Sequence, residues 1–346
     1  MIFDFVIIGG GTAGLSAAIR LGELGKSALI IESGTYPSHK ICGEFFSPQS
    51  IEQLNHWGIK TIEIAQANFY VPGNKWSFTF PKKAGSLSHI TFDPLLVSKA
   101  HKAEIFSNTK VTSIVPGFSS HEITLSSGAT IKTEKLLIAT GKVLQKKQKK
   151  MPAFPYFGIK SHFKLSKDIG SLEMFLFPGG YVGVSPIENG QCNIAGLISA
   201  RLFLKYGSAN RIIETFKKKN SRFLEILANS NQIFSDWMVA PIPSFGFKQL
   251  PVWPNTYFLG DAAATVPPIT GNGLSIAIRN GVLAAEYAIE KDATGFKYAT
   301  QEGYSKSIIY GKWMHYLAVN SFSSGCIAWI GKRFPRFIEI LYSKSR

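Results

Sequence analysis

The sequence predicts an α/β protein with a parallel sheet at its N-terminus and an inserted antiparallel sheet near its middle. The run Phe3 to Ile8 is apolar and rich in β-branched residues, as in a strand that is buried on both faces, and a glycine-rich turn and a helix-compatible segment follow it. Residues Glu173 to Phe177, Gly180 to Ser185 and Gln191 to Ile198 predict three short strands, because Pro-Gly-Gly and Glu-Asn-Gly turns separate them.

The opening strand, turn and helix have the spacing of a dinucleotide-binding unit. Gly9, Gly11 and Gly14 allow a tight turn, the approach of a pyrophosphate and close packing of helix on strand. A second strand, Ala28 to Ile31, ends at Glu32, whose carboxylate is placed to bind ribose hydroxyls. The residues that we expect at the cofactor here are Gly9, Gly11, Thr12, Ala13, Gly14, Glu32 and Ser33.

A second glycine motif lies near the other end of the chain and favours FAD over NAD. A strand at residues 257–259 ends in Gly260-Asp261, and a helical stretch at 275–289 follows a second glycine turn. A helix N-terminus at this place would stabilise the anionic reduced flavin. The expected cofactor contacts here are Gly260, Asp261, Pro268, Gly271, Asn272, Gly273 and Leu274.

Between these motifs lies a third one, Lys40-Ile41-Cys42-Gly43-Glu44. Together the three resemble the FAD-dependent superfamily of p-hydroxybenzoate hydroxylase and geranylgeranyl reductase, closest to the geranylgeranyl reductase-like branch with its Cys-Gly-Glu segment. The resemblance covers about residues 1–290 and implies an FAD/NAD(P)-binding Rossmann-like domain of the glutathione reductase type with an inserted antiparallel-sheet substrate domain. It adds Lys40, Cys42, Gly43, Val111 and Gly141 to the expected cofactor contacts.

Under this resemblance the FAD-binding domain is discontinuous. It comprises residues 1–70, 86–150 and 250–300, the substrate-binding domain comprises 71–85 and 151–249, and 301–346 form a C-terminal helical tail. Residues 204–228 are expected to be helical. Several aromatic residues of the insertion suggest an apolar substrate pocket, or ordinary sheet core: Phe154, Tyr156, Phe157, Phe175, Phe177 and Tyr181.

The resemblance implies an FAD-dependent oxidoreductase that reduces a double bond of a prenyl, lipid-like or aromatic polyketide substrate, with NAD(P)H as reductant. The alternatives are a monooxygenase that acts through a C4a-hydroperoxide, a halogenase, and a non-catalytic flavin-binding protein. Ala139-Thr140-Gly141 lacks the acid of the hydroxylases' Asp-Gly motif, and the Trp-x-Trp-x-Ile-Pro motif of tryptophan-type halogenases is absent. Both departures favour the reductase.

Cys42 and Glu44 are the candidate catalytic residues. The thiol either tunes the flavin and helps to protonate the product, or simply packs. Glu44 either donates a proton or orients Lys40. The histidines at positions 39, 89 and 162 are isolated in the sequence and are expected to be surface or structural groups; the one at 89 stands four residues before Asp93, where relatives often place an arginine.

The net charge of +16 and a pI near 9.6 suggest anionic partners, but the lysines are scattered and no nucleic-acid reader motif accompanies them. The run Lys142 to Lys150 would hold an NADPH phosphate or a lipid head group, or be a solvated loop. Three widely spaced cysteines support neither a disulfide framework nor a metal site, and they fit a reducing cytoplasm. The apolar stretch 314–331 and the basic residues after it favour a packed helix or peripheral membrane contact; the oligomeric state is not predicted.

Overall fold

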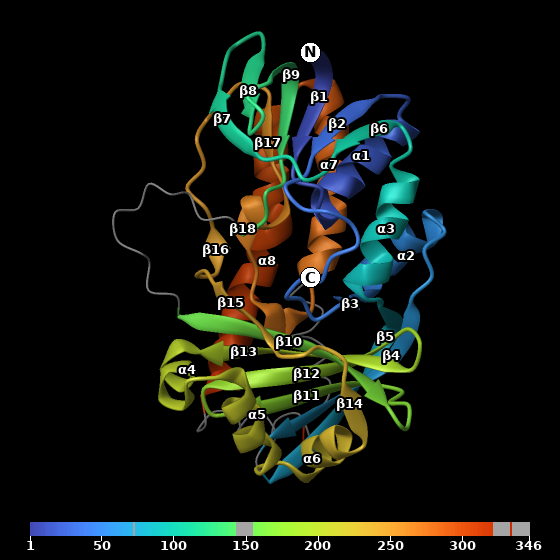
Figure 1. Cartoon of the computed structure of the whole chain (residues 1–346), viewed down its shortest axis with the longest axis vertical. Coiled ribbons are helices and arrows are strands. Elements are labelled where there is room, and N and C mark those ends of the chain that lie inside the picture. Colours follow the sequence, from blue (N-terminus) through green and yellow to red (C-terminus); the bar gives the residue numbers. More distant parts are fainter. Residues whose placement is uncertain (72, 143–154, 321–332, 334–346) are drawn as a thin grey trace.

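The computed structural model describes residues 1–71, 73–142, 155–320 and 333. Two sheets lie one above the other along the long axis of the molecule, and a long helix, α8 (Ala293–Val319), runs beside both (Figure 1). Phe154, Cys326 and nearly all of the lysine run 142–150 lie outside the described residues, as does most of the basic tail. The predicted α/β class with an inserted antiparallel sheet is confirmed.

The upper sheet contains the cofactor motifs. Its order is β6 (Ala103–Phe106), β2 (Ala28–Ile31), β1 (Ile2–Ile8), β9 (Thr130–Ile138), β8 (His121–Leu125) and β7 (Val111–Val115), and β17 (Thr256–Phe258) also pairs with β9. The four central pairings, β6 with β2, β2 with β1, β1 with β9 and β9 with β17, are parallel. The carboxyl ends of β2, β1, β9 and β17 therefore meet at one edge, where open α/β sheets bind ligands.

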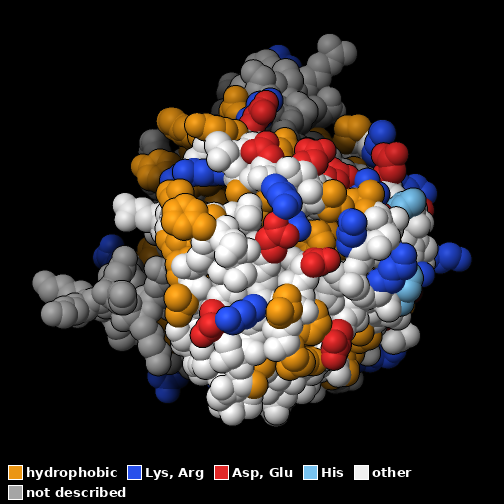
Figure 2. Space-filling model, turned by 90° about the horizontal axis from the view of Figure 1, so that it is seen from above, with side chains coloured by type: hydrophobic (Ala, Val, Ile, Leu, Met, Phe, Trp, Pro, Cys, Tyr) orange, Lys and Arg blue, Asp and Glu red, His pale blue; other side chains and the backbone are white. Residues whose placement is uncertain are grey.

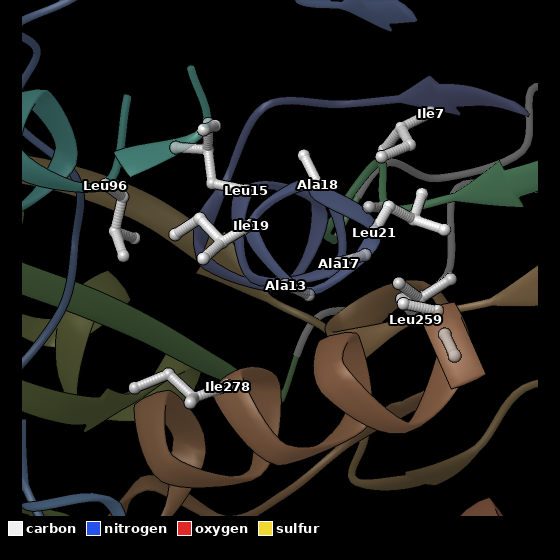
Figure 3. Close-up of a cluster of buried hydrophobic side chains, with 14 of the residues drawn as sticks. Ile7, Ala13, Leu15, Ala17, Ala18, Ile19, Leu21, Leu96, Leu259 and Ile278 are labelled. Atoms are coloured by element: carbon white, nitrogen blue, oxygen red, sulfur yellow. The ribbon is translucent and has the colours of Figure 1, made fainter. Parts of the chain in front are cut away.

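Helices α1 (Thr12–Glu23), α3 (His89–Lys99) and α7 (Gly273–Glu290) pack together against one face of this sheet. In α1 small residues, Ala13 and Ala17, point toward α7, and larger residues such as Leu15 and Ile19 fill the space toward α3 (Figure 3). The close crossing is permitted by Gly281 of α7, where an added Cβ would lie 2.3 Å from the Ala13 carbonyl oxygen.

The lower sheet is mostly antiparallel. It has nine strands, with the order β14 (Ser230–Gln232), β10 (Tyr156–Leu165), β13 (Gln191–Ser199), β12 (Gly180–Ile187), β11 (Leu172–Phe177), β4 (Ile62–Val71), β5 (Asn74–Ser86) and β3 (Phe45–Phe46), while β15 (Met238–Ile242) pairs with β10. The three strands predicted between residues 173 and 198 are confirmed. Strand β4 forms a long antiparallel hairpin with β5, in which Ile62 pairs with Ser86, and its residues 67–70 also pair in parallel with β11.

Three short helices cover the outer face of this sheet: α4 (Ala200–Tyr206), α5 (Ala209–Lys217) and α6 (Ser221–Ala228). Each follows a Ser or Asn whose side chain accepts from a first-turn N–H, which ends the preceding helix or strand and starts the next helix. The expected helix 204–228 is thus divided into separate capped pieces. The remaining elements are α2 (Pro48–His56), β16 (Gly246–Phe247), β18 (Ala264–Thr265) and the short helices η1 (Gly260–Ala262) and η2 (Pro268–Thr270).

The aromatic residues of the insertion divide between the two faces of the lower sheet. Phe175 and Phe177 pack on Phe216 and Phe223 of the outer helices, and Phe157 stacks on Phe203. These three are therefore core residues and not pocket residues, because strand alternation turns them away from the upper sheet. Tyr156 and Tyr181 belong to the inner cluster between the sheets.

On the face shown in Figure 2, basic and acidic side chains are interspersed and no continuous basic patch is visible. Within the described residues, no helix is both long and apolar enough to cross a membrane.

Candidate functional site

The glycine turn lies between β1 and α1, at the carboxyl edge of the upper sheet. Gly9 has φ +102°, and its Cβ would meet the Ala139 carbonyl oxygen at 2.3 Å; a Cβ on Gly14 would lie 2.0 Å from the Gly9 oxygen. Gly11 has open space beside it, and no described side chain caps the first turn of α1, which begins with Thr12 and Ala13. The free N–H groups of such a turn form an anion site.

Glu32 lies beside this turn at the end of β2. Its carboxylate accepts hydrogen bonds from the backbone N–H groups of Gly10 at 2.6 Å and Gly34 at 2.7 Å, and Ser33 is adjacent. Tyr36 donates to the Gly10 carbonyl oxygen at 2.5 Å and fixes the turn from the other side, a contact that sequence reasoning missed. The loop before Val111 bonds to the Glu32 and Gly34 backbone, which brings the start of β7 to this carboxylate.

The second glycine motif meets the same edge from β17. Gly260 has φ +57° and donates its N–H to the buried Asn280 side chain of α7 at 2.8 Å. Gly271 has φ +64° between η2 and Asn272, which precedes α7, and no described side chain caps that helix. A Cβ on Gly273 would meet nothing within 4 Å, so the N-terminus of α7, at Gly273 and Leu274, borders open space.

Two lysines close the edge beside Asp261. Lys142 lies 3.7 Å from the Asp261 carboxylate, and both side chains are about one third exposed. Lys248 donates to the Gly141 carbonyl oxygen at 3.1 Å, and burial lowers the pKa of its ammonium group. Sequence reasoning missed Lys248 and Asn280, because each acts through a backbone group distant in sequence.

These residues fit FAD. Two uncapped helix N-termini, α1 and α7, border open space beside Gly11 and Gly273, as the pyrophosphate and the flavin require. The carboxylates of Glu32 and Asp261 follow β2 and β17, whose carboxyl ends lie at the same edge of the sheet, where they can accept from ribose and ribityl hydroxyls. Among the described residues no group of His, Cys, Asp and Glu could hold a metal ion.

The Cys-Gly-Glu segment is brought against the N-terminus of α7. Ser47 and Ser50 hydrogen-bond the Ser275 hydroxyl of α7 at 2.7 and 2.8 Å, and the Phe45 ring lies where a Cβ of Gly271 would be. The segment that contains the half-buried Cys42 and the exposed Gly43 thus leads directly into the contact with the N-terminus of α7, where the flavin is expected. Gly43 has open space beside it.

Glu44 is the centre of a fully buried ionic cluster. Its carboxylate accepts from the Lys160 ammonium at 2.5 Å, from His162 Nε2 at 2.7 Å and from the His89 backbone N–H at 2.8 Å. Burial alone would raise the pKa of the Glu44 carboxyl, but the hydrogen bond from His162 and the charge of Lys160 lower it below its ordinary value. Glu44 is held as a carboxylate, which disfavours the proton-donor role.

The structure also corrects the second role considered for Glu44. Lys40 pairs with Asp93 at 2.7 Å, so Glu44 does not orient the Lys40 side chain; only the Lys40 carbonyl touches the cluster, through Lys160 at 3.0 Å. The histidines at positions 39, 89 and 162, which are isolated in the sequence, come together in the fold as structural groups. His89 and His162 are buried in charge networks, and His39 packs on the His162 ring with a centroid distance of 5.1 Å.

The inner face of the lower sheet lies opposite this segment. Lys160, Ala195 and Gly183 are cross-strand neighbours on that face, and Asn193 donates to the Cys42 carbonyl oxygen at 2.9 Å. Gly183 and Ala195 stay partly exposed although they lie on central strands. Accessible surface therefore remains over the middle of the sheet, bordered by the apolar side chains of Phe69, Met174 and Leu197.

Comparison with known proteins agrees with this geometry. The family model described as pyridine nucleotide-disulphide oxidoreductase matches residues 6–169. A menaquinone reductase of Mycolicibacterium smegmatis is 23% identical, with 88% of this chain and 81% of that protein covered. The digeranylgeranylglycerophospholipid reductase 2 of Methanopyrus kandleri is 26% identical, with 85% of this chain and 79% of that protein covered.

Solved structures show the same fold over nearly the whole chain. The flavin-dependent brominase Bmp2 has a TM-score of 0.81 at 18% identity and covers 100% of this chain and 94% of its own. The probable FAD-dependent monooxygenase pqsL of Pseudomonas aeruginosa has a TM-score of 0.76 at 16% identity, with 94% and 99% covered. The chain is an FAD-dependent oxidoreductase, with relatives named as reductases and with monooxygenase and halogenase structural neighbours.

Proposed function

We propose that the chain reduces a carbon–carbon double bond of a hydrophobic, prenyl-like substrate. The observation that carries the proposal is the accessible, apolar strip over Gly183 and Ala195, which lies on the same face of the lower sheet as Asn193, the residue that binds the Cys42 carbonyl oxygen. A flexible isoprenoid chain matches such a strip, because it needs apolar contacts along its length and few hydrogen bonds. Relatives named menaquinone reductase and digeranylgeranylglycerophospholipid reductase support the same substrate class.

In this proposal the glycine turns and the two helix N-termini hold FAD, which supplies a hydride once NAD(P)H or another donor has reduced it. The carbon next to the one that accepts the hydride needs a proton. Cys42 is the proposed donor, because it lies on the flavin side and is half-buried. Tyr156, Tyr181 and the apolar strip keep water away from the reacting carbon.

Glu44 has an anchoring role in this proposal. Its carboxylate ties the Cys-Gly-Glu loop to β10 through Lys160 and His162, and to the start of α3 through the His89 N–H. Three partners on two elements hold the loop in one conformation, as a proton donor on a loop requires. We also propose that residues 1–70, 86–150 and 250–300 form the FAD-binding domain around an inserted substrate domain. The tail would contact a membrane.

The test is anaerobic mixing of the reduced holoenzyme with menaquinone or with a digeranylgeranyl phospholipid in micelles. Flavin reoxidation without oxygen, together with a product two mass units heavier whose added hydrogens lie in the prenyl chain and not on the quinone ring, supports the reductase. Cys42→Ala should slow this step, whereas Cys192→Ala, which alters a buried thiol of the outer core, should not. Reoxidation only with oxygen, together with an oxygenated product, would instead establish the monooxygenase alternative.

A further inference from the structure

Four side chains from two segments form a continuous row beside the expected flavin. The His89 imidazole lies close enough to the Cys42 thiol to lower the pKa of that thiol. On its other side, His89 Nδ1 lies 2.9 Å from Asp93 Oδ1, and the second Asp93 oxygen lies 2.7 Å from the Lys40 ammonium. His89 and Asp93 are one helical turn apart on α3 and are 3% and 0% exposed, so the helix itself holds the Asp93 carboxylate against the His89 ring.

The backbone around Cys42 is also fixed. The Glu44 N–H donates to the Cys42 sulfur at 3.4 Å, and the Asn193 side chain donates to the Cys42 carbonyl oxygen at 2.9 Å. A backbone N–H that donates to a sulfur and a cationic imidazole beside it both stabilise the thiolate over the thiol.

We propose that Cys42, His89 and Asp93 form a proton relay. In this relay His89 is a positioning residue that holds Cys42 as a thiolate, and the proton to be transferred stays on the His89 ring. The proposal deepens the proposed reductase function and rests on it for the identity of the proton acceptor. During turnover the N–H bond of the His89 imidazolium breaks, its proton passes through the Cys42 sulfur, and a new C–H bond forms on the substrate. Solvent then returns one proton to His89, and Asp93 keeps the ring oriented.

The electrostatics of the row agree with this arrangement. Burial alone would raise the pKa of the Cys42 thiol, but the hydrogen bond and charge of His89 lower it below the ordinary value. Burial alone would lower the pKa of His89, yet the bonds to Asp93 and Cys42 raise it to about 9. The Glu44 carboxylate acts in the opposite direction on Cys42 and is itself paired with Lys160 and His162.

The other described cysteine provides an internal contrast. Cys192 is fully buried on the outer face, among Phe163 and Ile194, and burial raises the pKa of its thiol to about 12. No histidine is among the causes of that shift. Burial therefore does not activate a thiol in this fold, and the difference at Cys42 comes from His89.

The test is the rate of alkylation of each cysteine of the FAD-loaded protein by iodoacetamide between pH 5 and 10, read by peptide mass spectrometry. We expect Cys42 to react at neutral pH, with a midpoint at least one pH unit below that of an ordinary thiol near 8.5. His89→Asn should raise this midpoint by one unit or more, and Asp93→Asn should raise it less, since the imidazole remains. The matched control, His101→Asn, removes an exposed histidine at the end of α3 and should leave the midpoint unchanged.

A wild-type midpoint at 8.5 or above, or an unchanged midpoint in His89→Asn, would overturn the relay. Should His89→Asn fail to fold, the absorbance of the thiolate near 240 nm in wild-type protein gives the same midpoint without any substitution. In turnover, kcat should fall above about pH 9, where His89 loses its proton. Alkylation requires no substrate, so absence of prenyl reduction with a low Cys42 midpoint would refute the proposed function and leave the thiolate intact.

Discussion

Gly281 sets the distance between the two helices whose N-termini hold FAD in our proposal. A Cβ at this position would lie 2.3 Å from the Ala13 carbonyl oxygen and 2.8 Å from the Ser16 Cβ, both on α1. Ordinary contact begins at 3.4 Å, so Gly281→Ala requires α7 to move away from α1 by about 1.1 Å, the difference between 3.4 and 2.3 Å. Overpacking of this kind costs about 1–3 kcal/mol in free energy of unfolding.

The same movement separates the N-terminus of α7 from that of α1. Loss of one hydrogen bond to a charged group, worth about 1.5–3 kcal/mol, would weaken FAD binding about 10- to 150-fold. We would measure thermal unfolding at a fixed FAD concentration and titrate FAD into the apoprotein. The matched control is Gly303→Ala in α8, because an added Cβ at this position meets nothing within 4 Å. This substitution should stabilise the helix by about 0.5–1 kcal/mol.

The packing argument fails if Gly281→Ala unfolds at the wild-type temperature and binds FAD with wild-type affinity. It also fails if Gly303→Ala destabilises the protein as much as Gly281→Ala does. A loss of FAD affinity with unchanged stability would mean that α7 yields locally near its N-terminus, and the predicted cost to the core would then be wrong.

Three further substitutions test the roles of Lys160, Glu32 and His315. Lys160→Met leaves the Glu44 carboxylate without its cation and should lower the free energy of unfolding, measured by urea denaturation, by about 3 kcal/mol. The control Lys164→Met changes an exposed lysine and should alter this free energy by less than about 0.5 kcal/mol. Glu32→Gln should raise the FAD dissociation constant about 10- to 150-fold in the apoprotein titration, while the exposed Glu52→Gln should not change it. Burial lowers the pKa of His315 to about 4, so the unfolded chain binds the proton first as pH falls below about 6.5. Wild type should therefore lose about 3 kcal/mol of stability relative to His315→Leu between pH 6.5 and 4. If the melting temperatures of the two proteins change in parallel over this range, the burial of His315 is contradicted.

The cofactor half of the molecule was predictable because its signals are local. The β1 strand, the Gly9 turn, α1, β2 and Glu32 follow one another within a single βαβ unit, and each element has its own periodicity or turn signal. The Gly260 motif was equally visible, since a glycine with positive φ and an acid directly follow a strand. The parallel order of β2, β1, β9 and β17 then brings these residues to one edge.

The partners of the Cys-Gly-Glu segment were not predictable in this way. Lys160 and His162 are 116 and 118 positions from Glu44, and Asn193 is 151 positions from Cys42. Strand alternation alone does not say which face of β10 turns toward the upper sheet. The sequence therefore did not show that the histidines lie near Glu44. It also did not show which aromatic residues face the outer helices and which face the upper sheet.

By itself the sequence determined the α/β class and predicted an FAD site at the strand ends, because glycine spacing and strand patterns are properties of short segments; that Cys42 belongs to this site stays a prediction. Only the tertiary structure decided that Glu44 is a paired anchor and that His89 and Asp93 stand behind Cys42. The physical reason is desolvation. A buried charge is stable only with its partners in contact, and those partners come from strands and helices that meet only in the folded chain.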